Sequence, residues 1–423
     1  MDHYPLRDGI LHCEDVPLPR IASEVGTPLY VYSTAAMLGQ VRALKAALAP
    51  LDDPLIAYAV KANPNPAVLE TFAAQGLGAD VVSGGEYRRA RAAGIAADRI
   101  VFSGVGKTEA EMALALEGGL CQFNLESVPE AEMLSAVAGS MGLEAPVALR
   151  VNPDVEAGSH AKISTGAAHN KFGVAIADAL AACDRIAGLP GLALKGVAVH
   201  IGSQLTSLAP LEAAFARLGE LIGALRSAGH DIRTADLGGG LGLVYDPQAP
   251  APPSPADYGA MVARSTRGWG ARLIFEPGRL LVGDSGILLT RVIRIKPGPA
   301  LPFVIVDAAM NDLMRPTLYD AWHAIEAVEP SDGSMVADIV GPVCETGDTF
   351  ARSRRIDRVQ AGDLMIIRTA GAYAATMAGT YNSRPLAPEV LVRGGDWAIV
   401  RERPQVEAFL EDYRRPLWLA GKG

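Results

Sequence analysis

Short apolar runs alternate with helix-like stretches from about Thr27 to Gly278. Each run is followed by a Gly, Asn, Ser or Asp break, and then by an Ala-, Leu- and Glu-rich stretch whose apolar residues recur every three or four positions. This alternation predicts successive β-strand and helix units with parallel strands. The predicted strands span 55–61, 78–83, 100–104, 122–127, 147–153, 194–202, 234–240 and 272–278, with helical stretches such as 66–74, 85–93, 109–117 and 211–228 between them.

Eight strands alternating with helices over about 250 residues predict a (β/α)8 barrel. After Gly286 the pattern changes to short apolar runs, at 287–295, 303–307, 335–340 and 364–369, separated by Pro and Gly. These runs predict a second, all-β domain. We therefore expect an N-terminal strand segment at 1–26 that docks on the β-domain, a barrel at 27–282 and the β-domain at 283–423.

Composition places the chain among globular proteins. It has 423 residues, of which 49% are hydrophobic and 20% charged, and a formal net charge of -9 without any basic block. This balance argues against nucleic acid or an anionic membrane as the main partner and favours small molecules. The four cysteines form no C-x-x-C pair, so neither a disulfide framework nor a zinc site is expected. No leader-like or membrane-length apolar run is present, and we expect a cytoplasmic protein.

The ends of the predicted strands carry the residues suited to chemistry. In such barrels the active site lies at the carboxyl ends of the strands, where the βα loops converge. Here these ends carry Lys61, His200, the glycine cluster 238–242 and the pair Glu276 and Arg279. Lys61 alone would more often be a solvated lysine at the rim, but held in the barrel mouth it would suit Schiff-base chemistry.

The neighbours of Lys61 strengthen the chemical interpretation. Successive glycines at the end of strand seven let backbone N–H groups approach a phosphate, although the same residues could form merely a tight turn. Glu276 could hydrogen-bond a protonated pyridine nitrogen, or it could form a structural salt bridge with Arg279. His200 taken alone would more often be a core histidine than a catalyst.

Two nucleotide-binding motifs are excluded. The sequence GVGKT at 104–108 resembles the end of a phosphate-binding P-loop, but the first glycine of that motif would fall on Val101, inside a strand. The stretch 238–243 lacks the third glycine of the dinucleotide-binding pattern, since Leu243 stands there and no long helix follows.

Six motifs occur in an order that resembles the alanine racemase-like group of pyridoxal phosphate enzymes, and within it the diaminopimelate decarboxylase family. They are YAVKAN at 58–63, HIGSQ at 200–204, GGGLG at 238–242, EPGR at 276–279, GPVCETGD at 341–348 and GAY at 371–373. The resemblance covers essentially the whole chain. One departure is Asn170, which precedes 171–173 where other members can carry serine.

The resemblance implies pyridoxal 5'-phosphate as the cofactor and assigns its contacts. Lys61 would bind the cofactor covalently, His200 would stack on its ring and Glu276 would pair with the ring nitrogen. The remaining cofactor contacts would come from Ser203, Gly239, Gly240, Pro277, Gly278, Arg279 and Tyr373.

The resemblance also implies a proton donor and a substrate pocket. Cys344 would donate the proton, and the substrate would contact Arg279, Arg315, Tyr319, Glu345 and Tyr373. The site would be completed across a homodimer, with Cys344 and Glu345 acting on the cofactor of the partner subunit. Cys344 taken alone would more often be an inert thiol.

The implied reaction is decarboxylation of meso-diaminopimelate at its D-centre to L-lysine and CO2, the last step of lysine biosynthesis by the diaminopimelate route. This substrate has a carboxylate at its far end, which the guanidinium of Arg315 could bind bidentately, unless Arg315 is a surface residue. The alternatives are an ornithine, lysine or arginine decarboxylase on the same fold and a non-catalytic pyridoxal phosphate carrier. A further alternative, a sugar-phosphate enzyme on a plain barrel, predicts a colourless protein.

Overall fold

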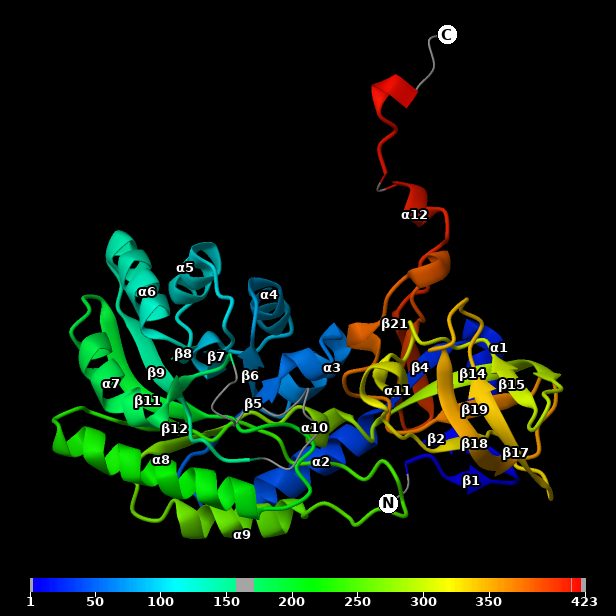
Figure 1. Ribbon diagram of the computed structural model, residues 1–423, viewed down its shortest axis with the longest axis horizontal. Helices are drawn as coiled ribbons and strands as arrows, with labels where there is room; N and C mark the ends of the chain where they lie inside the picture. Colours follow the sequence, from blue (N-terminus) through cyan, green and yellow to red (C-terminus); the bar gives the residue numbers. More distant parts are fainter. Residues whose placement is uncertain (1–2, 157–170, 412, 420–423) are drawn as a thin grey trace. The chain divides into compact units, whose positions relative to one another are not determined.

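Eight parallel strands form a closed barrel in the computed structural model, which describes residues 3–156, 171–411 and 413–419. The strands pair in the circular order β9, β11, β12, β13, β5, β6, β7, β8 and back to β9 (Figure 1). Their bounds are β5 (Leu55–Ala59), β6 (Gly78–Val81), β7 (Ile100–Phe102), β8 (Gln122–Leu125), β9 (Ala145–Asn152), β11 (Leu192–Val199), β12 (Thr234–Asp236) and β13 (Arg272–Phe275). Each of the eight predicted strands is present, and the (β/α)8 class is confirmed.

The barrel strands are buried on both faces, which explains their nearly continuous apolar sequence. All five residues of β5 are buried, for example. Outside the strands lies a ring of helices in which each packs against the next along the chain from α3 to α9. The helices are α2 (Thr34–Leu48), α3 (Pro66–Ala73), α4 (Gly84–Ala92), α5 (Glu109–Glu117), α6 (Val128–Met141), α7 (Ala179–Ala187), α8 (Ala209–Ser227) and α9 (Pro255–Ser265).

Local sequence signals fix where several helices begin. Thr108 caps α5 in a reciprocal pair with Glu111, and Ser254 caps α9 in the same way with Asp257. Such a pair satisfies two backbone N–H groups that the first helical turn leaves without partners. The short helices are therefore bounded by their own residues as well as by packing on the barrel.

The second compact unit comprises residues 1–35 and 285–423 and consists mostly of sheet. Its main sheet has the order β18-β17-β15-β14-β4-β20-β21, and β19 pairs with both β14 and β16. The bounds are β4 (Leu29–Ser33), β14 (Gly286–Lys296), β15 (Phe303–Val306), β16 (Ile325–Ala327), β17 (Ser334–Val340), β18 (Thr349–Asp357), β19 (Leu364–Ile367), β20 (Glu389–Arg393) and β21 (Asp396–Arg401). The four runs predicted after Gly286 correspond to β14, β15, β17 and β19.

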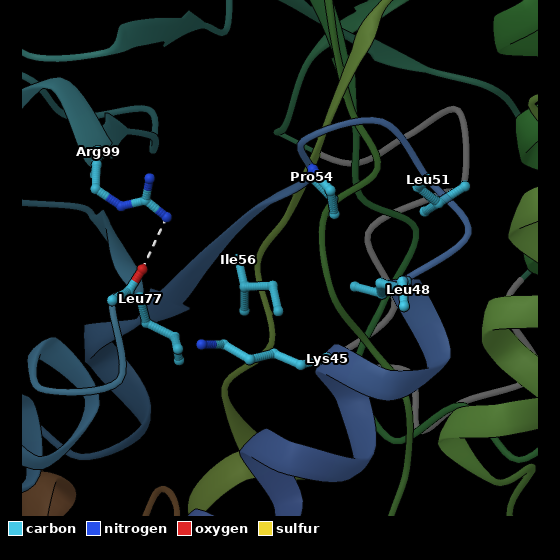
Figure 2. Close-up of a pocket in the computed structure, with 9 residues that line it drawn as sticks. Lys45, Leu48, Leu51, Pro54, Ile56, Leu77 and Arg99 are labelled. Carbon is cyan, nitrogen blue, oxygen red and sulfur yellow. Dashed lines mark hydrogen bonds between the residues drawn. The ribbon is translucent and has the colours of Figure 1, made fainter.

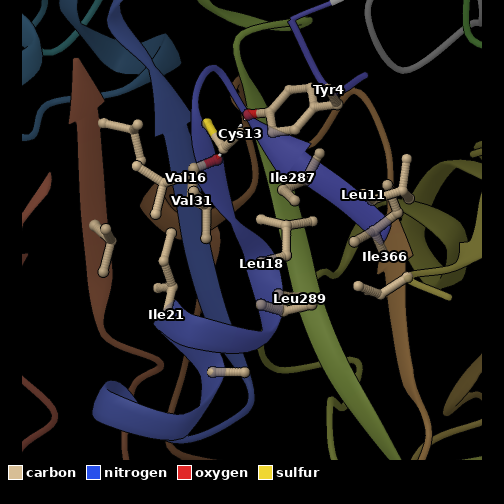
Figure 3. Close-up of a cluster of buried hydrophobic side chains, with 14 of the residues drawn as sticks. Tyr4, Leu11, Cys13, Val16, Leu18, Ile21, Val31, Ile287, Leu289 and Ile366 are labelled. Atoms are coloured by element: carbon tan, nitrogen blue, oxygen red, sulfur yellow. Dashed lines mark hydrogen bonds between the residues drawn. The ribbon is translucent and has the colours of Figure 1, made fainter. Parts of the chain in front are cut away.

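The N-terminal residues pack on this sheet. They form β1 (Leu6–Arg7), β2 (Ile10–Cys13), β3 (Val16–Pro17) and α1 (Leu18–Val25), and the Leu11 N–H donates to the Val328 carbonyl. Figure 3 shows Leu18 beside Ile287 and Leu289 of β14, in a cluster of buried apolar side chains that also contains Ile21. This packing supports the proposal that the N-terminal segment docks on the β-domain.

The barrel unit comprises residues 36–284, whereas the sequence led us to expect a barrel domain from 27 to 282. Residues 29–33 form β4, which lies between β14 and β20 in the sheet unit. An isolated apolar run does not show which sheet it will join, because that depends on pairing with residues more than 250 positions away.

A cavity of about 300 Å³ lies beside the amino-terminal ends of β5 and β6 (Figure 2). Two cationic side chains line it, and both hydrogen-bond backbone carbonyls. Lys45 Nζ donates to Gln75 O, and Arg99 Nη2 donates to Gly76 O. This end of a (β/α)8 barrel generally serves stability, so we do not place a site there. None of the helices in the described ranges combines the length and apolarity needed to cross a bilayer.

Candidate active site

Lys61 follows β5 directly, in a single 3-10 turn (Val60–Ala62) at the carboxyl end of the strand. Its Nζ lies 2.8 Å from Oδ2 of Asp80, on the adjacent strand β6. The side chain of Asp80 is fully buried, whereas 38% of the Lys61 side chain is exposed. The amine is thus oriented by a buried carboxylate while it remains accessible from the barrel mouth. Sequence reasoning did not identify Asp80.

Glu276 belongs to a buried polar network that crosses the interior of the barrel. Its Oε1 accepts hydrogen bonds from Ser103 Oγ at 3.2 Å and from Asn124 Nδ2 at 3.3 Å. The same Asn124 nitrogen donates to Asp236 Oδ2 at 2.8 Å, and Asp236 Oδ1 accepts the Gly238 N–H at 2.9 Å. Two carboxyl groups therefore lie within hydrogen-bonding distance of one amide nitrogen.

Both carboxyl groups retain a proton to a higher pH than usual. Burial raises the pKa of Glu276 well above its usual value, and the charges of Asp236 and Asp80 raise it further. Burial also raises the pKa of Asp236 to about 6. Because Glu276 and Asp236 hydrogen-bond each other, a protonated Glu276 can donate to an ionised Asp236. We missed Asp236, Asn124 and Ser103 from the sequence.

His200 follows β11 and is neutral in this site. Its Nδ1 accepts the Gly239 N–H at 3.2 Å, so that nitrogen is unprotonated and Nε2 carries the hydrogen. Burial lowers the pKa of His200 well below its usual value, and the charges of Arg150 and Lys61 lower it further. A neutral, flat imidazole suits stacking against another aromatic ring.

The glycine cluster after β12 is required by close backbone packing. A Cβ on Gly239 would lie 2.2 Å from the carbonyl oxygen of Glu276, and a Cβ on Gly240 would lie 2.4 Å from that of Gly202. Gly240 also has a φ of +117°, which side-chain-bearing residues rarely adopt. The glycines thus let three loops converge at one end of the barrel.

The segment after β13 leads from Glu276 through Pro277 and Gly278 into the short helix α10 (Arg279–Val282). Arg279 Nη2 donates to Ser203 Oγ at 3.1 Å, and Arg279 Nη1 donates to the Tyr245 hydroxyl. The Arg279 guanidinium also lies over the Tyr245 ring, 5.6 Å from its centroid. A cation is therefore held beside the glycine cluster, as an anion site requires.

The remaining predicted residues belong to the sheet unit. Arg315 begins α11 (Arg315–Tyr319) and is buried, with Tyr319 half-buried at the other end of the helix. Cys344 and Glu345 lie exposed on one loop, where the Cys344 N–H donates to Asn382 Oδ1 at 3.1 Å. Tyr373 is half-buried and has a φ of +54°. These residues and those of the barrel thus form two groups, each within its own unit.

Three hydrogen bonds organise the loop that carries Cys344. The buried carboxylate of Asp348 accepts the Val343 N–H at 2.7 Å and the Met310 N–H at 2.6 Å. The Thr317 hydroxyl donates to the Gly347 carbonyl at 2.7 Å and so joins the loop to α11. Arg315 and the loop that carries Cys344 are therefore parts of one local structure.

Lys107, the lysine of the excluded P-loop sequence, is structural. Its Nζ donates to the carbonyls of Gly104 and Asn124 and forms an ion pair with Glu130 at 2.6 Å. The Lys107 side chain is fully buried. It therefore fastens the loop between β7 and α5 and is not available to bind a phosphate.

The barrel group fits pyridoxal phosphate. It combines an accessible lysine amine, a buried carboxyl that can hold a proton, a neutral imidazole and a cation beside a glycine cluster. Oδ1 of Asp80 is buried and accepts no hydrogen bond from the residues that the structure describes, so an acceptor remains available next to Lys61. Within the described ranges, no group of three or more His, Cys, Asp or Glu side chains is arranged to hold a metal ion.

The comparisons with known proteins agree with this donor set. The model of a family described as "Pyridoxal-dependent decarboxylase, pyridoxal binding domain" matches residues 37–283. The chain is 57% identical to diaminopimelate decarboxylase of Zymomonas mobilis over 418 residues, covering 98% of this chain and 99% of the relative. It is 50% identical to that of Neisseria meningitidis serogroup B, covering 94% and 95%.

Solved structures extend the likeness to the whole fold. Diaminopimelate decarboxylase from M. jannaschii in complex with L-lysine matches with a TM-score of 0.95 at 33% identity, and 99% of each chain is covered. The Helicobacter pylori enzyme complexed with L-lysine matches with a TM-score of 0.90 at 37% identity, covering 93% of this chain and 98% of that one. The chain therefore belongs to the pyridoxal-dependent decarboxylases and, within them, to the diaminopimelate decarboxylase family.

Proposed function

We propose that this chain removes the carboxylate of the D-configured centre of meso-diaminopimelate as CO2 and releases L-lysine, the last step of lysine biosynthesis by the diaminopimelate route. The observation that carries this proposal is the placement of Lys61 and of Glu276, whose pKa is raised by burial, around one barrel mouth, in a chain that matches relatives of that name along its length. Pyridoxal phosphate, when bound, supplies an electron sink for the electron pair that the departing CO2 leaves behind.

The barrel residues would bind the cofactor and hold its protons. Lys61 Nζ would hold it covalently and exchange with the substrate amine, with Asp80 orienting the amine. Glu276 would hold a proton at the ring nitrogen. The imidazole of His200 would cover one face of the ring and exclude water there. Phosphate contacts would come from Ser203, Gly239, Gly240, Gly278 and Arg279, with Pro277 fixing the turn between them.

The residues of the sheet unit would complete the reaction. The thiol of Cys344 would deliver a proton from Sγ to the carbon that has lost CO2. Glu345 would bind the distal amine and Arg315 would bind the distal carboxylate, and Arg279, Tyr319 and Tyr373 would be further contacts of the substrate. A substrate that ends in an amine alone would leave the guanidinium of Arg315 without a partner.

The site would be shared in a homodimer, with Cys344 and Glu345 of one subunit serving the cofactor of the other. In a two-fold dimer each subunit gives and receives the same loop, so both sites are complete or neither is. We place the protein in the cytoplasm, because a cysteine that donates a proton must remain a reduced thiol. All four cysteines are free thiols in the structure.

A comparison of substrates tests the proposed activity. Purified holoenzyme is supplied in turn with meso-diaminopimelate, L-ornithine, L-lysine and L-arginine, and CO2 and the product amine are measured. We expect kcat/KM for meso-diaminopimelate to exceed the others by about ten- to a hundredfold, since each of the others lacks the distal carboxylate and one lost charge-assisted contact costs about 1.5–3 kcal/mol. Preference for L-ornithine or L-arginine would identify a different decarboxylase. Bound cofactor without CO2 release from any substrate would indicate a carrier.

A further inference from the structure

A buried histidine contacts Arg315 directly. Arg315 Nη1 and His323 Nε2 lie 2.8 Å apart, and His323 Nδ1 lies 2.8 Å from the carbonyl oxygen of Arg368. His323 is 1% exposed and Arg315 is 6% exposed. The sequence reasoning assigned a role to Arg315 but none to His323, which stands eight residues further along the chain.

The two contacts determine the tautomer of His323. A guanidinium has only donors, so His323 Nε2 must accept from Arg315 with its lone pair. The Arg368 carbonyl has only acceptors, so His323 Nδ1 must carry the hydrogen and donate it. The imidazole is therefore neutral, and both of its nitrogens are used in a fixed direction.

A second arginine fixes the position of the histidine. Arg354, on β18, donates from Nη1 to the His323 carbonyl at 2.8 Å. Its guanidinium also lies 4.2 Å from the centroid of the Trp322 ring. The Trp322–His323 segment is thus held by its backbone from one side, while the imidazole holds Arg315 on the other.

We infer that His323 is a positioning residue for substrate selection, which orients the Arg315 guanidinium toward the distal carboxylate of the substrate. This inference rests on the proposed function, in which Arg315 binds that carboxylate. An arginine side chain has several rotatable bonds, whose freedom is lost when the substrate binds. A hydrogen bond that already holds one guanidinium nitrogen of Arg315 reduces this entropic cost of binding. His323 would therefore affect affinity for ligands that carry the distal carboxylate and leave other ligands unaffected.

Two amide substitutions separate orientation of Arg315 from simple structural support. In His323→Gln the side-chain oxygen can occupy the place of Nε2 and accept from Arg315, while the bond to the Arg368 carbonyl is lost. In His323→Asn the side-chain amide can occupy the place of Nδ1 and still donate to Arg368, but it does not reach Arg315. Our inference predicts that His323→Gln retains affinity for ligands with the distal carboxylate and that His323→Asn loses it, whereas a structural role through Arg368 predicts the reverse.

The experiment titrates the full-length holoenzyme with two ligands and follows the visible absorbance of the cofactor. L-Lysine retains the distal carboxylate of the substrate, and 1,5-diaminopentane has no carboxylate. For His323→Asn we expect the dissociation constant of L-lysine to rise about tenfold, corresponding to the loss of one well-oriented charge-assisted contact, and that of the diamine to change less than twofold. For His323→Gln we expect both constants to stay within about threefold of wild type.

Steady-state kinetics provide a second readout. With meso-diaminopimelate, His323→Asn should raise KM about tenfold and change kcat less than threefold, because the contact is made in the ground state as well as in the transition state. His12→Asn serves as the matched control, since His12 lies on β2 and its ring hydrogen-bonds the Ile10 carbonyl at 3.0 Å. Both titrations should match wild type in this control.

The outcomes separate the proposed role of Arg315 from the inference about His323. If Arg315→Ala weakens L-lysine and the diamine equally, the proposed role of Arg315 fails. If Arg315→Ala selectively weakens the binding of L-lysine but His323→Asn does not, or if His323→Asn binds L-lysine better than His323→Gln does, the inference about His323 is overturned. Retained diamine binding reports a folded site. Should His323→Asn not fold, His323→Leu, which also lacks the acceptor, must show the same selective loss.

Discussion

Lys61 Nζ lies 2.8 Å from Asp80 Oδ2, and the two residues stand at corresponding ends of neighbouring strands. This pairing places a buried carboxylate against the one lysine assigned to the cofactor. Removing the amine would leave the carboxylate in the barrel without its cation, which is costly in a buried site.

We therefore expect Lys61→Ala to abolish the visible absorbance of the lysine-bound cofactor and nearly all activity, and to destabilise the cofactor-free protein. Because Lys61 is 38% exposed, water moderates the loss, and we expect only about 1–2 kcal/mol. Lys61→Ala/Asp80→Asn should recover most of this free energy but none of the activity. Urea unfolding measures the first effect. A borohydride-fixed cofactor on another lysine of the single mutant would refute the assignment.

Glu276→Gln should separate cofactor binding from turnover. The amide can still accept from Ser103 and Asn124 through its oxygen, so the cofactor should bind within about tenfold of wild-type affinity. Turnover should fall much further, because a neutral amide cannot hold the proton of the ring nitrogen. Affinity is measured by titrating cofactor-free protein with pyridoxal phosphate, and turnover by CO2 release. Unchanged turnover would show that the ring nitrogen keeps its proton by other means.

The Asp236–Glu276 pair should make the stability of the cofactor-free protein depend on pH. The raised pKa values mean that the folded protein retains protons at a pH where the unfolded chain has lost them, so stability falls as pH rises from about 4 through about 6 and above. In Glu276→Gln the amide donates permanently to Asp236, and the part of the fall that comes from Glu276 should disappear. Urea midpoints at pH 6 and pH 9 test this. Parallel pH profiles for the two proteins would contradict it.

Mixed dimers should test whether sites are shared between subunits. Lys61→Ala and Cys344→Ala should each be nearly inactive, but a mixed dimer would place both lesions in one site and leave the other intact. Random reassortment makes about half of the dimers mixed, so activity should recover to roughly a quarter of wild type. A charge tag on one variant confirms exchange. Tagged heterodimers without recovered activity would mean that Cys344 acts within its own chain.

Lys107→Met should destabilise the barrel because it leaves Glu130 without its buried cation. Breaking one side of a buried ion pair typically costs about 3–5 kcal/mol. The double variant Lys107→Met/Glu130→Gln should be less destabilised than the single one, which urea unfolding can show. A loss below about 1 kcal/mol in the single variant would mean that water reaches Glu130 and satisfies it.

The barrel strands and most of the residues suited to chemistry could be predicted from local sequence patterns. Strands buried on both faces must be apolar, and helices on the outside must have apolar residues every three or four positions, so both patterns are visible in one dimension. Lys61, His200 and Glu276 were recognisable because they come directly after such strands. The order of six motifs then indicated the cofactor and the family.

The sequence did not show the polar residues inside the strands. Asp80, Asn124 and Asp236 each stand within a predicted strand, where a polar residue is unfavourable unless it finds a partner. Their presence in otherwise apolar runs was the available signal. Their partners lie on other strands or directly after them, up to 152 positions away for Asn124 and Glu276, so only closure of the barrel shows that they form one network.

Only the folded structure shows which sheet β4 joins and which side chain contacts Arg315. The strand 29–33 precedes the barrel in sequence, yet it pairs with β14 and β20. His323 meets Arg315 because α11 ends at Tyr319 and the chain turns back through Asp320, whose φ is +51°. Local sequence specifies strands and helices because their periodicity is local. Strand partners and side-chain tautomers depend on contacts between distant residues, which exist only once the chain has folded.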